Sequence, residues 1–182
     1  FLDIARLDDE KTYKKLLAKT PVIESTLEIP EETDYKEHSS LIALPALQNG
    51  QYYIVFSNNN SFKDYDDLIY STFQVSNLSY FHVDIDENTN IYIVNRETGA
   101  PIKDVVAHFS ERKYSYKSGR YERTIIGDFY SDNDGFIVVP DLGKTVFVDL
   151  YFNNDTLIST SLVDCYRYNS YDDIKIKSTI FT

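Results

Sequence analysis

Alternating apolar and polar residues, broken by tight-turn residues, fill the second half of this sequence. The stretch IYIVNRETGAPIKDVVAHF runs from Ile91 to Phe109, and SDNDGFIVV runs from Ser131 to Val139. Alternation with a period of two places side chains on the two faces of a strand, and Gly, Pro, Asn and Asp mark the turns between strands. Strand candidates recur about every 8–12 residues without an intervening helix, which predicts a β-sandwich and argues against a doubly wound enzyme fold.

Glycine residues indicate three of these turns. Gly99 in RETGAP suits a positive backbone angle, and Pro101 begins the return strand. A second hairpin, SYKSGRYERTI, is expected to turn at Ser118 and Gly119, and a further turn is expected at Gly135. The strand before Gly99 and the strand after Pro101 are therefore expected to pair in one hairpin.

The sequence LDDEKTYKKLLAKTP, near the N-terminus, is the single helix candidate. Asp8 can cap its first turn, and Tyr13, Leu16 and Leu17 form one apolar stripe at helical spacing. Pro21 then ends the helix, because proline cannot continue the hydrogen-bond ladder.

Four strand candidates follow the helix: VIESTLEI, SSLIAL, QYYIVFS and LIYSTFQVS. The stretch SNLSYFHVDIDENTN is interpreted as a link to the second group of strands, with the domain boundary near Asn77. We therefore predict an all-β chain of two tandem β-sandwiches with one short N-terminal helix. The segments are residues 1–20 for the helix, 21–77 for the first β-domain and 78–182 for the second.

Charge and composition argue against several classes of function. The net charge of −11 repels phosphate backbones, so no nucleic-acid partner is expected. No run of about 18 apolar residues is present, so no membrane contact is expected. The chain begins with Phe1 rather than Met, and its first residues lack the order of a signal peptide. We interpret it as a fragment of a longer protein.

The residues that most often carry chemistry are few and scattered. The single cysteine, Cys165, excludes an internal disulfide and a cysteine-based zinc cluster, and the alternation around it predicts a buried thiol on a strand. His38, His82 and His108 are far apart and show no metal-binding spacing, so each is interpreted as an ordinary strand histidine. No catalytic, metal-binding or cofactor-binding residue is predicted.

Two acidic clusters each have two interpretations. DNDG, from Asp132 to Gly135, resembles half of a calcium loop, but a full loop needs a bidentate Glu further on, so a plain turn is preferred. Asp84 and Asp86 would share one strand face, where paired carboxylates can perform acid–base chemistry or hold a cation. A solvated loop is preferred, since an enzyme would need these carboxylates to converge in a pocket.

The segment ERKYSYKSGRYER, from Glu111 to Arg123, is basic and tyrosine-rich in an otherwise acidic chain. Aromatic and basic side chains on an exposed hairpin suit a tip that binds a protein, and tyrosines can also stack on sugar rings. A solvated hairpin whose tyrosines cover the sandwich edge is the other interpretation. The candidate interaction residues are Arg112, Tyr114, Tyr116, Arg120 and Tyr121.

The strand pair and the later turn resemble a known pattern. In the carboxypeptidase regulatory-like, prealbumin-like β-sandwich, a D/N-x-x-T-G-x-P-I/L-x-x-V-x-V strand pair precedes a T/S-D-x-x-G-x-F/Y turn. The first part is matched by Thr98, Gly99, Pro101, Ile102 and Val105, and the second by Ser131, Asp132, Gly135 and Phe136.

The order of the surrounding segments carries the resemblance further. ALPALQNGQYYIVFSNN, then YSTFQVSNLSYF, then this sandwich with its basic hairpin is similar to the N-terminal macroglobulin-like, immunoglobulin-type domains of bacterial alpha-2-macroglobulins. The long versions in Bacteroides-type bacteria are the most similar. The resemblance covers residues 38–182.

This resemblance implies structural domains of an endopeptidase inhibitor, a periplasmic or cell-surface protease trap whose parent protein can carry a lipid anchor. Its partners would be neighbouring domains of the parent chain and the trapped proteases. The family often uses a Cys–Gln thioester, but Cys165 is followed by Tyr-Arg rather than Gly-Glu-Gln, so no catalytic or bait residue is carried over. The alternative is a surface module that binds carbohydrate or protein through hairpin 111–123.

Overall fold

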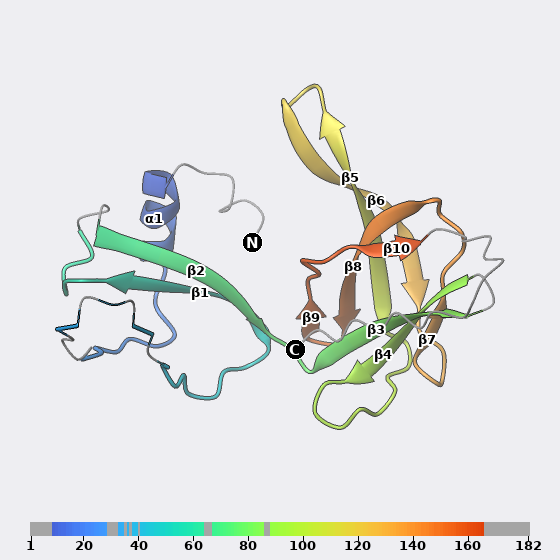
Figure 1. Ribbon diagram of the computed structural model, residues 1–182, viewed down its shortest axis with the longest axis horizontal. Helices are drawn as coiled ribbons and strands as arrows, with labels where there is room; N and C mark the ends of the chain where they lie inside the picture. The colour runs from blue at the N-terminus through green and yellow to red at the C-terminus, as the bar shows by residue number, and fades with distance from the viewer. Residues whose placement is uncertain are drawn as a thin grey trace. The chain divides into compact units, whose positions relative to one another are not determined.

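The computed structural model describes residues 9–28, 33–34, 36, 38–39, 41–63, 67–85 and 88–165. The chain divides into two compact units, Phe1–Phe73 and Gln74–Thr182. The all-β class with one short helix is confirmed, since strands joined in antiparallel sheets account for most of the regular structure (Figure 1).

Unit 1 contains the helix and a two-stranded sheet. The elements are α1 (Asp9–Leu17), β1 (Gly50–Ser57) and β2 (Leu68–Val75), the last of which runs across the division between the units. The predicted helix is therefore confirmed. Its buried side chains are Thr12, Tyr13 and Leu16, whereas Leu17 is partly exposed. The Tyr13 hydroxyl donates to the carbonyl of Leu68 (2.5 Å), so the helix is attached to β2 by a side chain from its apolar stripe.

Two of the four strands expected in unit 1 are not formed. Residues 23–28 and 41–48 have no strand pairing, and Leu41, Ile42 and Leu44 are exposed. Alternation gives a strand its two faces, but a strand also needs a neighbour for its main-chain hydrogen bonds. Neither stretch has such a neighbour among the residues that the structure describes.

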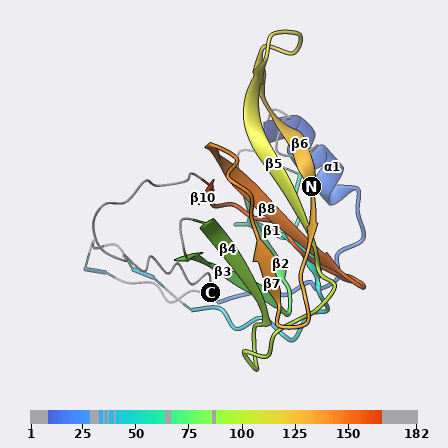
Figure 2. The same cartoon turned by 90° about the vertical axis from the view of Figure 1, so that its right-hand side faces the viewer.

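Unit 2 is a sandwich of two antiparallel sheets (Figures 1 and 2). One sheet has the order β3-β4-β7, and the other has the order β10-β8-β5-β6 with β9 paired to β8. The strands are β3 (Leu78–Ile85), β4 (Asn88–Asn95), β5 (Val106–Ser115), β6 (Arg120–Tyr130), β7 (Phe136–Val138), β8 (Lys144–Phe152), β9 (Asp155–Leu157) and β10 (Val163–Cys165).

The core of unit 2 lies between these sheets. Alternate residues of β3 and β4 point inward from one side, including Leu78, Tyr80 and Ile93, and Phe109 and Val148 do so from the other. All five are almost completely buried. The inward positions therefore follow the period of two that the sequence indicates.

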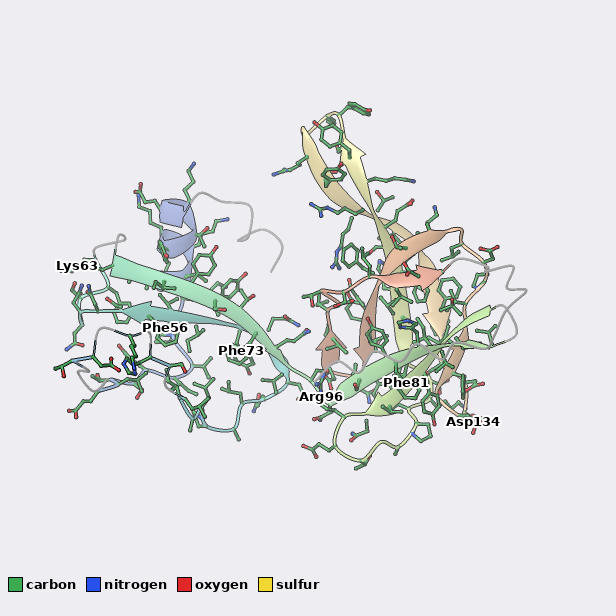
Figure 3. The ribbon with its side chains drawn as sticks, viewed as in Figure 1. Phe56, Lys63, Phe73, Phe81, Arg96 and Asp134 are labelled. Carbon is green, nitrogen blue, oxygen red and sulfur yellow. The ribbon has the colours of Figure 1, made fainter. Side chains whose placement is uncertain are left out.

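The interpretation of residues 76–90 as a link between the domains is wrong. Leu78–Ile85 is strand β3, which pairs along its full length with β4. Arg96 secures the start of this strand, because its guanidinium donates to the carbonyls of Ser76 and Leu78, both at 3.1 Å (Figure 3). Polar residues near Asp84 suggested a loop, but the inward apolar positions of β3 decide its structure.

The prediction that the strands on either side of Gly99 pair in one hairpin is also wrong. Gly99 does adopt a positive φ of 70°, and Val94 and Pro101 form one antiparallel bridge. Beyond that bridge the chain crosses to the opposite sheet, passing Asp104 at a positive φ of 60°. Strand β4 then pairs with β3 and β7, whereas β5 pairs with β6 and β8. Alternation identifies both strands but does not say which sheet each one joins.

Candidate functional site

The tyrosine-rich segment is a two-stranded β-ribbon that extends beyond its sheet. Strand β5 pairs with β8 only from Val106 to Ser110, but it pairs with β6 as far as Ser115 and Arg120. The remaining ribbon, residues 111–124, projects past the sandwich in both views (Figures 1 and 2). Its turn is the predicted one, with Gly119 at φ 67° and its amide donating to the carbonyl of Ser115 (2.8 Å).

The three predicted tyrosines form one cluster at the end of the ribbon. Tyr114 lies directly across from Tyr121, and their rings meet edge-to-face at 5.3 Å. The ring of Tyr116 meets that of Tyr114 edge-to-face at 5.2 Å. The exposed fractions are 46% for Tyr114, 93% for Tyr116 and 58% for Tyr121. Edge-to-face contacts stabilise the cluster internally while it remains accessible to a partner.

The two predicted arginines lie on different faces of the ribbon. The guanidinium of Arg112 lies over the Tyr121 ring, 4.8 Å from its centroid, so it belongs to the tyrosine cluster. Arg120 pairs with Ser115 one position further on, and strand alternation places it on the opposite face. There its Nε lies 3.8 Å from the carboxylate of Glu122. The structure thus joins Arg112 and the three tyrosines but separates Arg120 from them.

The opposite face of the ribbon is a network of ion pairs. Glu111 lies between Lys113 and Lys144 and bonds to both ammonium groups. Hydrogen bonds from these lysines, that of Lys113 first, lower the pKa of the Glu111 carboxyl below its ordinary value. Ion pairs made by solvent-exposed lysines contribute little to stability.

Arg123 anchors the base of the ribbon to the sandwich, a role not identified in the sequence. It lies across from Arg112, and its guanidinium reaches Asp149 on β8 and packs 3.9 Å over the ring of Phe147. A second guanidinium nitrogen donates to the carbonyl of Ser159 (2.6 Å). Arg123 is therefore a positioning residue for the ribbon rather than part of its exposed tip.

The outer face of the larger sheet also carries a His–Asp pair. His108 Nδ1 lies 2.5 Å from Asp128 Oδ1, and its ring meets that of Tyr151 edge-to-face at 6.3 Å. Burial, followed by the negative charge of Asp149, raises the pKa of the Tyr151 hydroxyl. This pair extends the polar and aromatic surface toward the body of the sandwich.

Among the residues that the structure describes, the other sequence candidates do not assemble into a site. The turn at Asp132 is confirmed: its carboxylate accepts from the amides of Asp134 and Phe136, both at 2.9 Å. Asp86 and the side chain of Asp84 lie outside the described residues. His38 pairs with Asp34 in unit 1, far along the chain from the histidines of β3 and β5. In the described part of the chain, no three His, Cys, Asp or Glu side chains form a group that could hold a metal ion.

The prediction of a buried thiol is confirmed. Cys165 lies on β10, is 1% exposed and belongs to the core of unit 2. Its sulfur lies 3.9 Å from the carbonyl of Val163. A thiol buried among apolar side chains is a packing residue, because reactivity requires an accessible thiolate.

Comparison with known proteins adds no relative: no family model, curated protein or solved structure matches this chain. Within the described segments, no helix has the length and apolarity needed to cross a bilayer.

Proposed function

We propose that this chain is a non-catalytic structural part of a bacterial alpha-2-macroglobulin-like endopeptidase inhibitor, a trap for proteases. The observation that carries the proposal is the role of the residues in the family-like pattern. Five residues of that pattern meet at one joint between the two sheets of unit 2, namely Pro101, Ile102, Val105, Ser131 and Gly135.

Ser131 is the centre of this joint. Its hydroxyl donates to the carbonyl of Ile102 (2.8 Å) and accepts from the amide of Val105 (2.9 Å). Its own amide donates to the carbonyl of Val105 (3.1 Å), and its carbonyl accepts from the amide of Asp104 (3.0 Å). Four hydrogen bonds therefore tie the end of β6 to the segment that crosses between the sheets.

Gly135 closes the other side of the joint. Its carbonyl accepts from the amide of Ile93 (2.8 Å), and its φ of 76° is in the left-handed region. A Cβ atom at this position would lie 2.5 Å from the carbonyl oxygen of Ile93 and 3.1 Å from Cβ of Pro101. Only glycine lets the two backbones approach this closely.

Roles of this kind support a rigid spacer rather than a reaction centre. The carboxylate of Asp132, which could otherwise take part in chemistry, accepts main-chain hydrogen bonds within its own turn. In the proposed trap, the partners are neighbouring domains of the parent protein and the captured proteases. The proposed location is the periplasm or the cell surface, where the parent protein can carry a lipid anchor.

Protease capture by the full-length protein tests this proposal. The protein is incubated with a bacterial serine protease, and hydrolysis of casein and of a small chromogenic peptide is followed. A trap excludes casein from the captured protease but admits the small peptide, so only casein hydrolysis is expected to fall. The isolated 182-residue chain is expected to protect neither substrate. Unchanged casein hydrolysis with the full-length protein, or hydrolysis by the chain itself, would contradict the proposal.

A further inference from the structure

The edge strand β6 carries large apolar side chains on the outer face of its sheet. Tyr121, Ile125 and Tyr130 are 58%, 64% and 65% exposed. Each lies across from a residue of β5 that faces away from the core, as the buried Ala107 and Phe109 on the opposite face indicate. Single exposed apolar residues are ordinary, but several on one face of one strand mark an interaction surface.

The outer edge of β6 is open to pairing. Among the described strands β6 pairs with β5 alone, although it is the longest strand of the unit at 11 residues. The register shift between Phe109 and Ser110 leaves Ile126 as an extra residue on β6. This bulge separates the edge into two parts, and the part on the ribbon side runs regularly from Arg120 to Ile125. An unpaired regular edge is a template for an added strand.

The positive charge of the ribbon favours an acidic strand as the partner. Residues 111–123 contain five basic and two acidic side chains, a net charge of +3 in a chain of net charge −11. Among the described residues, no carboxylate forms an ion pair with Arg112 or Lys117, whereas Lys113, Arg120 and Arg123 each have one. An acidic partner is therefore attracted to the ribbon, and a basic partner gains nothing there.

The ring geometry favours a protein over a sugar. Neighbouring rings of the cluster are inclined by 85° for Tyr114 and Tyr116 and by 72° for Tyr114 and Tyr121. A row of sugar rings stacks best on aromatic faces that lie in one plane, and perpendicular rings do not provide such a platform. Tyrosine and arginine on an open strand edge are instead the residues that dominate protein–protein contacts.

We propose that the edge of β6 from Arg120 to Ile125 receives an extended acidic segment of a protein partner as an added strand. Main-chain hydrogen bonds to β6 supply the pairing, and apolar side chains of the segment cover Tyr121 and Ile125. The carboxylates of the segment that share this face lie beside Arg112, and those near the ribbon turn lie beside Lys117. This docking surface is independent of the trap proposal, because it rests on the ribbon and not on the joint at Ser131.

The test uses the full 182-residue chain and a capped ten-residue peptide, VTETVTETVT, in which valine and glutamate share one face of a strand and threonine occupies the other. Binding is measured by isothermal titration calorimetry, and the exchange of β6 amide protons is followed by NMR. We expect binding that weakens with added salt and slows amide exchange along β6. The corresponding valine–lysine peptide, and a valine–glutamate peptide with alternate amides N-methylated, are each expected to bind at least about tenfold more weakly.

Two pairs of variants locate the site. Tyr121→Ala together with Ile125→Ala is expected to weaken binding at least about tenfold, since exposed anchors of this kind dominate contact energies. Arg112→Ala removes a cation from the tyrosine face, and the matched control Lys113→Ala removes one from the opposite face. Only the first is expected to weaken binding. Thermal unfolding of each variant shows whether the sandwich remains folded.

Several outcomes would overturn the proposal. They are the absence of peptide binding at millimolar concentration, equal binding of the glutamate and lysine peptides, and binding that the Tyr121 and Ile125 substitutions leave unchanged in a folded protein. Binding on a glycan array, together with no response to the acidic peptide, would assign the tyrosine cluster to carbohydrate instead.

Discussion

Arg123 on β6 reaches across the intervening strand β5 to Asp149 on β8. One guanidinium nitrogen of Arg123 donates to both carboxylate oxygens of Asp149, at 3.1 and 3.0 Å. Asp149 also accepts from the amide of Ser159 (2.9 Å), so its buried carboxylate has three hydrogen bonds from two residues. The base of the exposed ribbon is therefore fixed by a charged contact that spans three strands of the sheet.

Replacing Arg123 with alanine is expected to lower the free energy of unfolding of unit 2 by about 1.5–3 kcal/mol, because Asp149 loses a charged donor in a largely buried site. Arg123→Lys keeps the charge but provides a single donor group, so a smaller loss is expected. Arg112→Ala is the control, with an expected loss of at most about 1 kcal/mol from its exposed ring contact. Urea unfolding followed by circular dichroism measures all three, and equal losses for Arg123→Ala and Arg112→Ala would contradict the anchoring role.

Two glycines with similar backbone angles should respond differently to alanine. Gly119 at the ribbon turn has open space around its Cβ position, so Gly119→Ala costs only backbone strain of about 1–3 kcal/mol. Gly135→Ala adds a clash with the carbonyl oxygen of Ile93 at 2.5 Å, so its loss of stability is expected to be clearly larger. Thermal unfolding of the two variants compares them. A loss of stability for Gly135→Ala no greater than that for Gly119→Ala would show that the backbones at Gly135 and Ile93 are not in such close contact.

The fully buried Phe109 packs against Phe129 with ring centroids 4.5 Å apart. Phe109→Ala is expected to cost about 3–5 kcal/mol, because it leaves a cavity between the sheets. Tyr116→Ala, at 93% exposure, is expected to change stability by no more than about 0.5 kcal/mol. Chemical denaturation measures the change in the free energy of unfolding for both variants. A small change for Phe109→Ala would show that Phe109 is not at the centre of the core.

The Glu111 carboxyl provides a test of the ribbon's ion pairs. Its pKa lies below the ordinary value of 4.5 because Lys113 and Lys144 bond to the ionised form. A depressed folded-state pKa means that the contribution to stability is present above the unfolded pKa and is lost as pH falls through the folded pKa. We expect ¹³C NMR titration to show Glu111 titrating at lower pH than a model glutamate. Lys113→Ala should raise the pKa of Glu111 again. A Glu111 pKa at the ordinary value in the unsubstituted chain would contradict the ion pairs.

Cys165 reports directly on opening of the sandwich, because it is the only thiol in the chain and is buried. A chromogenic disulfide reagent is expected to react with the native chain only as fast as the protein opens, and at once in concentrated denaturant. Immediate reaction in native buffer would show that the Cys165 thiol is not buried in the core of unit 2.

The local sequence was sufficient to predict the ribbon but not to predict how the ribbon is attached to the sandwich. Basic and aromatic residues on either side of Ser118 and Gly119 define a hairpin within 13 residues, and the structure has that hairpin. Arg123 and Asp149 are 26 residues apart, and nothing in the spacing of the sequence links them. Contacts of this kind depend on which strands become neighbours, and alternation carries no information about strand order.

The same limit explains the errors in strand pairing. The turn at Gly99 was predicted from its composition, but the crossing to the other sheet depends on hydrogen bonds between Ser131 and residues 102–105, far away in sequence. In unit 1, alternation near Leu41 predicted a strand for which the described residues offer no partner. The inward residues of β3 were misjudged because the acidic residues that follow them suggested a loop.

Protease capture by the full-length protein carrying Gly135→Val tests the structural role most directly, with Gly119→Val as the matched control. Valine at position 135 forces a side chain into the joint between the sheets, whereas valine at 119 lies in open space at the ribbon turn. If unit 2 supports the trap, the protein with Gly135→Val no longer protects casein from hydrolysis, whereas the protein with Gly119→Val still does. Full shielding by the 135 variant, with its sandwich shown to be disrupted, would contradict a scaffold function.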